Sequence, residues 1–320
     1  MKEETENKTI TIGGESVLPG KDKFLKITID RLPTGTLIDI PVYVFNAKNP
    51  GPAILVQAGL HGDEVNGIEI VRRMLQNGNF KVKAGAIIAV PILNIFGFIH
   101  FSRDVPDGKD VNRSFPGTKA GSMASRIAYY YTREIMHQVD FAIDLHTGGG
   151  QRNNFPQVRY TAEDEKSVEL ASVFNAPLTF SSSLIKGSFR NVAFTMKKPT
   201  IVYEGGESMR FDDFSITEGV KGILRVLRYL GMSNPKVLAD ISHKTIHLKE
   251  RKWLRASTAG IFIPKIPNGN KVKKGEEIGL VSDTYAMKTS KIKAPFDGYV
   301  ICLNHQAVVN QGDALYHIGR

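Results

Sequence analysis

The sequence of 320 residues contains one cysteine, one tryptophan and no long hydrophobic run. A single cysteine, Cys302, excludes an intramolecular disulfide framework and suits a reducing compartment, so we expect a cytoplasmic protein. The apolar residues around it predict a buried thiol and not a nucleophile. No apolar stretch approaches the ~18 residues of a membrane span, and residues 1–8 lack the apolar segment of a signal peptide. We therefore expect no association with a membrane.

A concentrated block of basic charge is also missing, although the formal net charge is +10. Residues 241–320 hold 13 Lys and Arg against 6 Asp and Glu, and the other 240 residues hold 29 against 26. The basic residues of the tail are spread along it and form no run of the kind that binds nucleic acid. We expect no nucleic-acid partner, and a basic surface that attracts small anionic molecules.

Apolar runs that alternate with helical periodicity predict the α/β class. Hydrophobic residues make up 42% of the chain and charged residues 23%, which are ordinary globular values. Strands alternating with helices favour a mixed, mostly parallel sheet that helices cover on both faces. The main predicted strands are 24–29, 37–45, 53–58, 86–93, 141–145 and 200–203, and the predicted helices are 66–75, 122–139, 168–174 and 218–230.

Three regions follow from the change of pattern along the chain. Residues 1–20 are polar and predict a mobile lead, residues 21–240 form the α/β domain, and residues 245–320 form a small β domain of short strands and glycine turns. Within the tail, residues 272–279 and 308–315 share one sequence pattern. In each, apolar and then polar residues precede a glycine, which is followed by one or two acidic residues and then by an apolar one. We expect this tail to be a lid over a site or a surface for homo-oligomer formation.

The tail resembles the barrel-sandwich fold of biotinyl and lipoyl carriers, which modify a lysine at a hairpin tip. Here Ala286-Met287-Lys288 is placed like such a tip. The following residue is Thr289 and not the usual methionine, so we interpret Lys288 as an ordinary exposed lysine. A carrier role for the tail is the alternative.

Three predicted strands end in polar groups of the kind that form an active site. His61 and Glu64 follow the strand at 53–58, His146 follows the strand at 141–145, and Glu204 ends the strand at 200–203. In open α/β sheets ligands bind beyond the carboxyl ends of the strands. Catalytic zinc usually has three protein ligands and one position for water. His61, Glu64 and His146 therefore predict a site for one zinc ion.

Alternatives remain for single residues of this site. Asp63 competes with Glu64 as a ligand. Asp144 points to the same face of its strand as His146 and either accepts a hydrogen bond from a ligand imidazole or binds local backbone. The order of the residues differs from the H-E-x-x-H signature of helix-borne zinc proteases.

The polar loop at 102–117 carries Arg103, Asn112 and Arg113 between the ligand segments. A guanidinium binds both oxygens of a carboxylate, and near a metal it can stabilise a developing oxyanion. The alternative is that these side chains are solvated charges of a surface loop and take no part in the site.

The motifs together resemble the succinylglutamate desuccinylase/aspartoacylase family, a branch of the zinc carboxypeptidase-like fold. The order H-G-D-E, D-V-N-R, D-L-H-T and Y-E-G-G spans roughly residues 20–240. The resemblance implies that His61, Glu64 and His146 bind zinc and that Glu204 is the general base. It also implies that Asn112 and Arg113 hold the substrate carboxylate and that Arg103 polarises the amide carbonyl.

The chain is most similar to the larger "predicted deacylase" branch of that family, whose members carry an extra C-terminal β domain. Some members of the branch deacetylate small diamino acids. We therefore expect a zinc amidohydrolase that removes the acyl group from a small N-acylated amino acid, with a glutamate-activated water as nucleophile. The alternative is a zinc carboxypeptidase acting on peptides. Glu207, three residues after Glu204, is the rival base.

Overall fold

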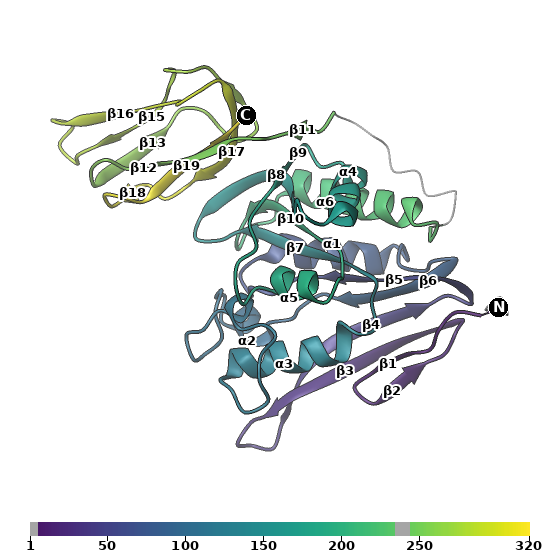
Figure 1. Cartoon of the computed structure of the whole chain (residues 1–320). Coiled ribbons are helices and arrows are strands. Elements are labelled where there is room, and N and C mark those ends of the chain that lie inside the picture. Colours follow the sequence, from purple (N-terminus) through teal and green to yellow (C-terminus); the bar gives the residue numbers. More distant parts are fainter. Residues whose placement is uncertain (1–5, 234–243) are drawn as a thin grey trace.

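A computed structural model describes residues 6–233 and 244–320. A long mixed β-sheet runs through the described chain, with helices on both faces (Figure 1). In spatial order its main path is β12 (Arg251–Arg255), β19 (Ala314–Gly319), β17 (Gly298–Asn304), β8 (Arg152–Tyr160), β10 (Thr200–Glu207), β7 (Phe141–Gly148), β5 (Asn49–Gln57), β6 (Ala84–Val90), β4 (Leu37–Asn46) and β3 (Lys21–Arg31).

The four strands at the centre of the sheet, β10, β7, β5 and β6, are parallel, and their outer neighbours β8 and β4 join them antiparallel. Their sequences are nearly continuous apolar runs because both faces are buried. Three short strands pair beside this main path. They are β9 (Leu178–Ser181), which pairs with β8, β11 (Ile246–His247), which pairs with β9, and β14 (Lys271–Val272), which pairs with β17.

Two apolar cores lie on the two faces of this sheet. One core contains side chains of α1 (Val65–Gln76), α4 (Glu165–Phe174) and α6 (Asp213–Tyr229). The other contains side chains of α3 (Met123–Ile135) and α5 (Phe189–Thr195). The long connection from β6 to α3 forms α2 (Ile95–Ile99) and a 3₁₀ turn, η1 (Val111–Arg113). The predicted α/β fold, with helices on both faces of a mixed sheet, is confirmed.

The polar N-terminal segment differs from the prediction of a mobile lead over residues 1–20. Within it, β1 (Ile10–Ile12) and β2 (Glu15–Val17) form a hairpin. Ile10, Ile12 and Val17 are buried in the core beside α3. Three apolar side chains on the inner face of this short hairpin hold it against the core, although the residues around them are polar.

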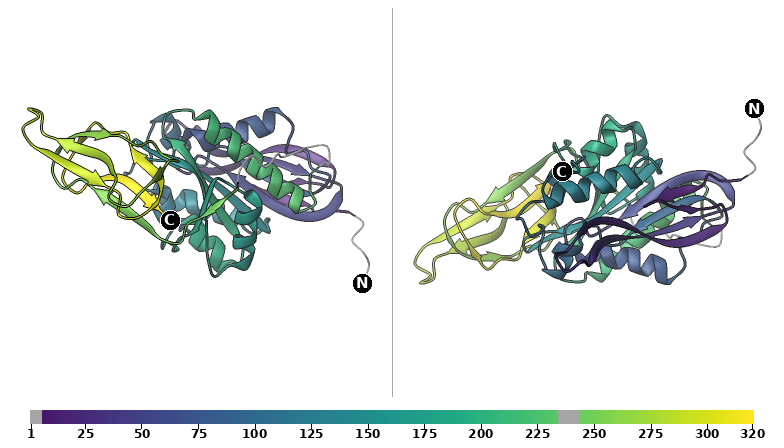
Figure 2. Two further views of the ribbon diagram at one scale, coloured as in Figure 1. Left: turned by 90° about the horizontal axis from the view of Figure 1, so that it is seen from above. Right: turned by 90° about the horizontal axis from the view of Figure 1, so that it is seen from below.

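The C-terminal residues form an antiparallel β region at one end of the molecule (Figure 2). A second sheet, of β13 (Gly260–Pro264), β15 (Glu277–Ser282), β16 (Thr289–Lys293) and β18 (Val308–Val309), packs against β12, β17 and β19 around an apolar core. Strand β17 pairs with β8, so the main sheet continues into this region. The predicted domain boundary at 240–245 falls largely on residues 234–243, which lie outside the described residues.

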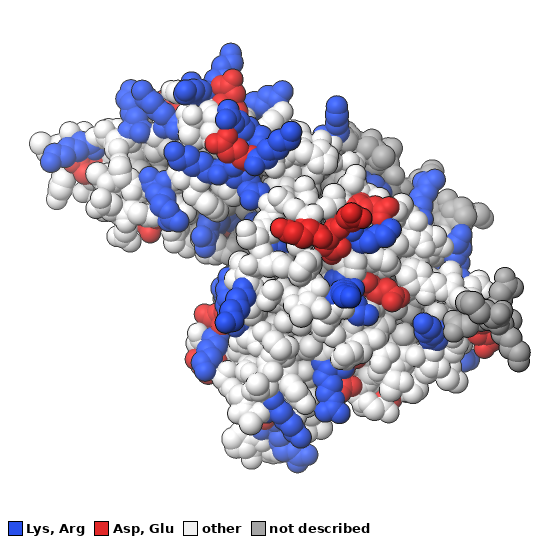
Figure 3. Space-filling view, viewed as in Figure 1, with Lys and Arg blue, Asp and Glu red and all other residues white. Residues whose placement is uncertain are grey.

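The charged side chains on the face shown in Figure 3 are dispersed, and Cys302 is buried. Lys and Arg side chains are dispersed over the visible face, many of them on the C-terminal region and interspersed with acidic ones (Figure 3). Among the described residues, no helix combines the length and the hydrophobicity of a membrane span. Cys302 is 1% exposed, and burial raises the pKa of its thiol to about 12.

Candidate active site

A tight turn between β5 and α1 carries His61 and Glu64. Gly59 adopts φ +60°, and a Cβ added at Gly62 would lie 1.8 Å from the carbonyl carbon of Gly97 in α2. The turn therefore packs directly on α2, in a way that only glycine allows. His61 and Glu64 are 2% and 3% exposed.

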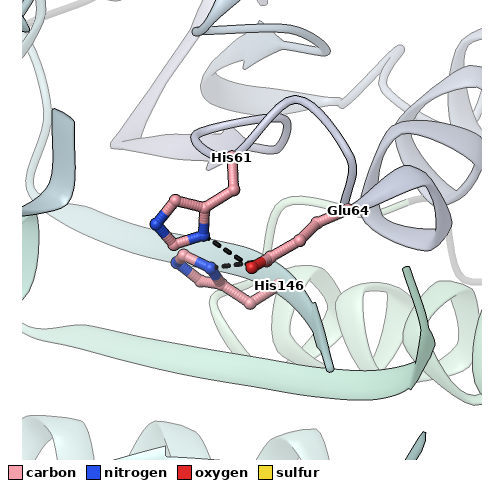
Figure 4. A group of neighbouring side chains, drawn as sticks. All are labelled: His61, Glu64 and His146. Atoms are coloured by element: carbon pink, nitrogen blue, oxygen red, sulfur yellow. Dashed lines mark hydrogen bonds and ion pairs between the residues drawn. The ribbon is translucent and has the colours of Figure 1, made fainter. Parts of the chain in front are cut away.

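His146, near the end of β7, completes a buried group with His61 and Glu64, here called the His–Glu–His group (Figure 4). One ligand atom from each residue lies within 4.8 Å of the others. The Nδ1 atom of His61 is 2.6 Å from Glu64 Oε1, and the Nδ1 atom of His146 is 2.9 Å from Glu64 Oε2. The two Nδ1 atoms thus converge on one carboxylate.

Each imidazole of this group has an aspartate on its other nitrogen. Asp110 Oδ1 lies 3.3 Å from His61 Nε2, and Asp144 Oδ2 lies 2.9 Å from His146 Nε2. Gln57 donates to Asp144 Oδ1 and so orients it. A carboxylate on the distal nitrogen is the usual arrangement around a metal-binding histidine, because it fixes the tautomer that leaves the other nitrogen free for the metal. Asp144 therefore contacts an imidazole, which was the first of its two predicted roles.

Sequence reasoning missed Asp110, the first residue of the D-V-N-R motif. Its side chain caps η1 by accepting from the backbone N–H of Asn112, and it also reaches His61. The available signal was its place at the start of the D-V-N-R motif, two residues before Asn112, where an aspartate can cap the turn that follows.

Opposed charges shape the pKa values in this group. Burial alone would raise the pKa of Glu64, but the charges of His61 and His146 hold it well below its usual range. Burial alone would lower the pKa of His61, but Glu64 and Asp110 raise it. An ionised carboxylate between two imidazoles favours a positive charge at this point. The donor types and their spacing fit a divalent cation such as zinc.

The loop residues predicted from the sequence lie beside this group. Arg103 donates from Nε and Nη2 to Asp110 Oδ2, at 3.1 and 2.9 Å, and its Nη1 is 3.4 Å from Glu64 Oε1. The Oδ1 atom of Asn112 accepts from the backbone N–H of Phe189, which fixes η1 against α5. Arg113 is half-exposed and lines the same cavity.

Glu204 stands next to His146 in the sheet, because the two are register partners on the parallel strands β10 and β7. Its carboxylate lines the cavity and contacts Arg159 Nη1 at 2.9 Å and Asn154 Nδ2 at 2.6 Å. Glu207, the rival base, is 2.6 Å from His305 Nδ1 and is absent from the cavity lining.

One cavity of about 330 Å³ is lined by the His–Glu–His group, by the loop residues Arg103, Asn112 and Arg113, and by Glu204. Five arginines line it, and the C-terminal region contributes Trp253 and Cys302. The arginines outnumber the lining carboxylates, so the cavity favours an anionic ligand. The lining residues that sequence reasoning did not single out include Arg152, Asn154, Arg159, Arg190 and Trp253.

Comparison with known proteins identifies the family. The catalytic domain of the Succinylglutamate desuccinylase/Aspartoacylase family matches residues 50–230. The N-alpha-acetyl-L-2,4-diaminobutyric acid deacetylase of Halomonas elongata is 27% identical over 314 residues, which cover 91% of this chain and 89% of that protein.

Solved structures share the fold over nearly the whole chain. The product-bound ectoine utilization protein EutE (DoeB) from Ruegeria pomeroyi is 25% identical with a TM-score of 0.81, covering 93% of this chain and 94% of that one. A succinylglutamate desuccinylase/aspartoacylase from Rhodobacter sphaeroides is 24% identical, also with a TM-score of 0.81, covering 94% and 95%. The chain belongs to the succinylglutamate desuccinylase/aspartoacylase family of deacylases that act on N-acyl amino acids.

Proposed function

We propose that the protein is a zinc-dependent deacylase that hydrolyses the amide bond of a small N-acyl amino acid. The observation that carries this proposal is the convergence of His61, Glu64 and His146 in a basic cavity that Glu204 also lines. The family supplies the reaction class. The donor set, with an aspartate behind each histidine, supports zinc as the metal.

Each of the polar side chains of the cavity has its own role in the proposed hydrolysis of the amide. The guanidinium of Arg113 binds the substrate carboxylate as a planar fork, with Asn112 holding the turn beneath it. Arg103 stabilises the negative charge that develops on the carbonyl oxygen. Glu204 takes a proton from the attacking water and passes it to the leaving amine. Zinc held by the His–Glu–His group would supply Lewis acidity and lower the pKa of water.

The size of the cavity favours a small substrate over a peptide. Trp253 and Cys302 of the C-terminal region line it, and a volume of about 330 Å³ suits one acylated amino acid. Neither the matched family nor the relatives named above are carboxypeptidases. The Halomonas relative acts on an N-acetylated diamino acid, as its name states, so N-acetyl amino acids are the first substrates to test.

A panel assay of the zinc-loaded protein tests the reaction class. The panel contains N-acetyl and N-succinyl derivatives of neutral, acidic and diamino acids, with a C-terminally blocked amide of each as matched control. We expect amine release from at least one free-acid substrate and little from its blocked partner, since Arg113 needs the carboxylate. Cleavage of peptides in preference to every N-acyl amino acid would contradict the proposal.

We further propose that the protein forms a homo-oligomer and that Lys288 carries no prosthetic group. Light scattering of the purified protein tests the first statement, and a mass equal to that of the unmodified chain tests the second. A biotinyl or lipoyl adduct on Lys288 would instead support the carrier role for the C-terminal region.

A further inference from the structure

Two side chains of β8 hold the carboxylate of Glu204, one at each oxygen. Arg159 Nη1 donates to Oε1 at 2.9 Å, and Asn154 Nδ2 donates to Oε2 at 2.6 Å. The side chain of Glu204 is only 12% exposed. Each carboxylate oxygen has a second lone pair that these two donors do not use. The carboxylate is therefore fixed in place and still able to accept a proton.

An irregularity in β8 makes this double contact possible. Residues 159 and 154 are an odd number of positions apart, so in a regular strand their side chains would point to opposite faces. Between the pairs Gln157↔Glu204 and Gly206↔Asn154, β8 advances by three residues and β10 by two. The extra residue in β8 is a bulge, and it turns Asn154 to the face that Arg159 already occupies. Bulges re-aim side chains in this way next to active sites.

Arg159 is itself supported by the neighbouring strand. Its guanidinium carbon lies 5.7 Å from the ring centroid of Phe180 in β9. The Arg159 guanidinium therefore lies near both the Phe180 ring and the Glu204 carboxylate. The side chains of Arg159 and Glu204 are 31% and 12% exposed, and a partly buried ion pair of this kind contributes little net stability, because desolvation offsets the attraction. The main effect of this ion pair is therefore on the geometry of Glu204 and not on the stability of the fold.

We propose that Arg159 and Asn154 are positioning residues for Glu204. A glutamate side chain has several rotatable bonds, and a general base acts only within hydrogen-bond reach of the proton it takes. Holding both oxygens removes that freedom before the substrate arrives, and such pre-organisation is a large part of catalytic rate. This inference rests on the proposed role of Glu204 as the base.

A double-mutant cycle tests whether Arg159 acts through Glu204. We expect Arg159→Gln to lower kcat by about 10²-fold with little change in KM, as for a misplaced catalytic group. In the Glu204→Gln background the same change should have no further effect on kcat, because residues that act as a unit are not additive. Asn154→Ala should behave in the same way, with a smaller loss. Arg159→Lys, which keeps a cationic donor, should recover part of the activity.

Arg251→Gln is the matched control. Its guanidinium also lies over the Phe180 ring, at 3.9 Å, but it donates to the backbone oxygen of Ser181 and not to Glu204. The Arg251→Gln substitution removes the same charge from the same ring and should leave kcat within about twofold, because this guanidinium donates to Ser181 and not to Glu204. Unchanged zinc content and thermal unfolding would show that the variants fold. A crystal structure of Arg159→Gln should show the Glu204 carboxylate displaced.

The outcomes separate this inference from the proposed function. Normal kcat in Arg159→Gln with an inactive Glu204→Gln would overturn the positioning role alone. Additive losses in the double variant, with a raised KM, would overturn it by showing that Arg159 contacts substrate directly. Near-normal turnover in Glu204→Gln would overturn the assignment of the base itself.

Discussion

In the His–Glu–His group, each imidazole has a carboxylate oxygen beside both of its ring nitrogens. Glu64 lies between the two Nδ1 atoms, and Asp110 and Asp144 lie at the two Nε2 atoms. Without a metal ion, three carboxylates surround two rings in a buried space, and Arg103 balances only part of their charge. Such a concentration of negative charge is costly unless positive charge neutralises it, which is the physical case for a metal here.

We expect His61→Ala and His146→Ala each to remove most of the bound zinc, because two ligands seldom hold catalytic zinc. Elemental analysis of the purified variants measures this. Asp144→Asn keeps the shape of the side chain and should weaken zinc binding by about 10–100-fold without abolishing it. Full zinc occupancy in both histidine variants would exclude this site.

The two arginines of the loop should affect different kinetic constants. Arg113→Ala should chiefly raise KM, since it removes a contact that substrate and transition state share. Arg103→Ala should chiefly lower kcat, since it removes a contact to the developing oxyanion. Steady-state kinetics on one N-acyl amino acid separates the two. If neither change alters kcat/KM by about tenfold, the loop has no part in the reaction.

At the scale of elements, the active-site strands could be predicted and their neighbour β8 could not. The runs at 53–58, 141–145 and 200–203 are apolar and lead into His61, His146 and Glu204, so strand and site share one signal. β8 reads R-N-N-F-P-Q-V-R-Y, with a proline in its middle, which argues against a strand. Pro156 lies at the bulge, where proline is tolerated because its missing backbone N–H is not needed for pairing with the neighbouring strand.

The site residues that could not be predicted are those whose roles depend on contacts between distant parts of the chain. Asn154 and Arg159 reach Glu204 only because β8 pairs antiparallel with β10 and carries the bulge. Asp110 reaches His61 across 49 positions of chain. Local patterns cannot supply such pairings, because they depend on which strands become neighbours in the sheet.

Strand β19 carries a histidine whose pKa should make stability depend on pH. His317 stacks on Trp253 with ring centroids 4.3 Å apart. Burial first, and then the charges of Arg159 and Arg251, lower the pKa of His317 to about 3. Between that value and the ordinary histidine pKa, the unfolded chain binds a proton that the folded chain does not. Stability should therefore fall on acidification, by at most about 1.4 kcal/mol per pH unit.

His317→Phe keeps the stack and removes the titration. Thermal unfolding of both proteins from pH 7 to pH 4 measures the effect. We expect the wild-type protein to lose stability faster than the variant below about pH 6.5, the ordinary histidine value. Parallel pH curves for the two proteins would contradict the lowered pKa.

For the whole molecule, the continuous sheet makes the C-terminal region part of the cavity. Strand β17 pairs with β8, and Trp253 of β12 reaches the same cavity as His146. The basic charge of this region adds to the five arginines of the lining. A lid and a surface for oligomer formation were the two roles predicted for this region. Because Trp253 and Cys302 line the cavity, we expect the region to limit the size of the substrate.

Trp253→Ala should enlarge the cavity and change selectivity more than rate. We expect KM for small N-acetyl substrates to rise by about tenfold, in line with the loss of one large apolar contact. Bulkier acyl groups should lose less or gain. Met287→Ala, at an exposed hairpin tip of the same region, is the control. Identical selectivity in the two variants would show that the C-terminal region does not shape the substrate site.

The replacement of Glu204 by Gln tests the central claim most directly, because it keeps the shape of the side chain and removes its basicity. Zinc content and single-substrate turnover are measured on the same preparation. We predict that zinc stays bound while kcat falls by roughly 10²–10⁴, the usual contribution of a general base. Glu207→Gln, in which the altered carboxylate contacts His305 outside the cavity, should keep most of its turnover. Near-normal turnover in Glu204→Gln together with an inactive Glu207→Gln would contradict the account.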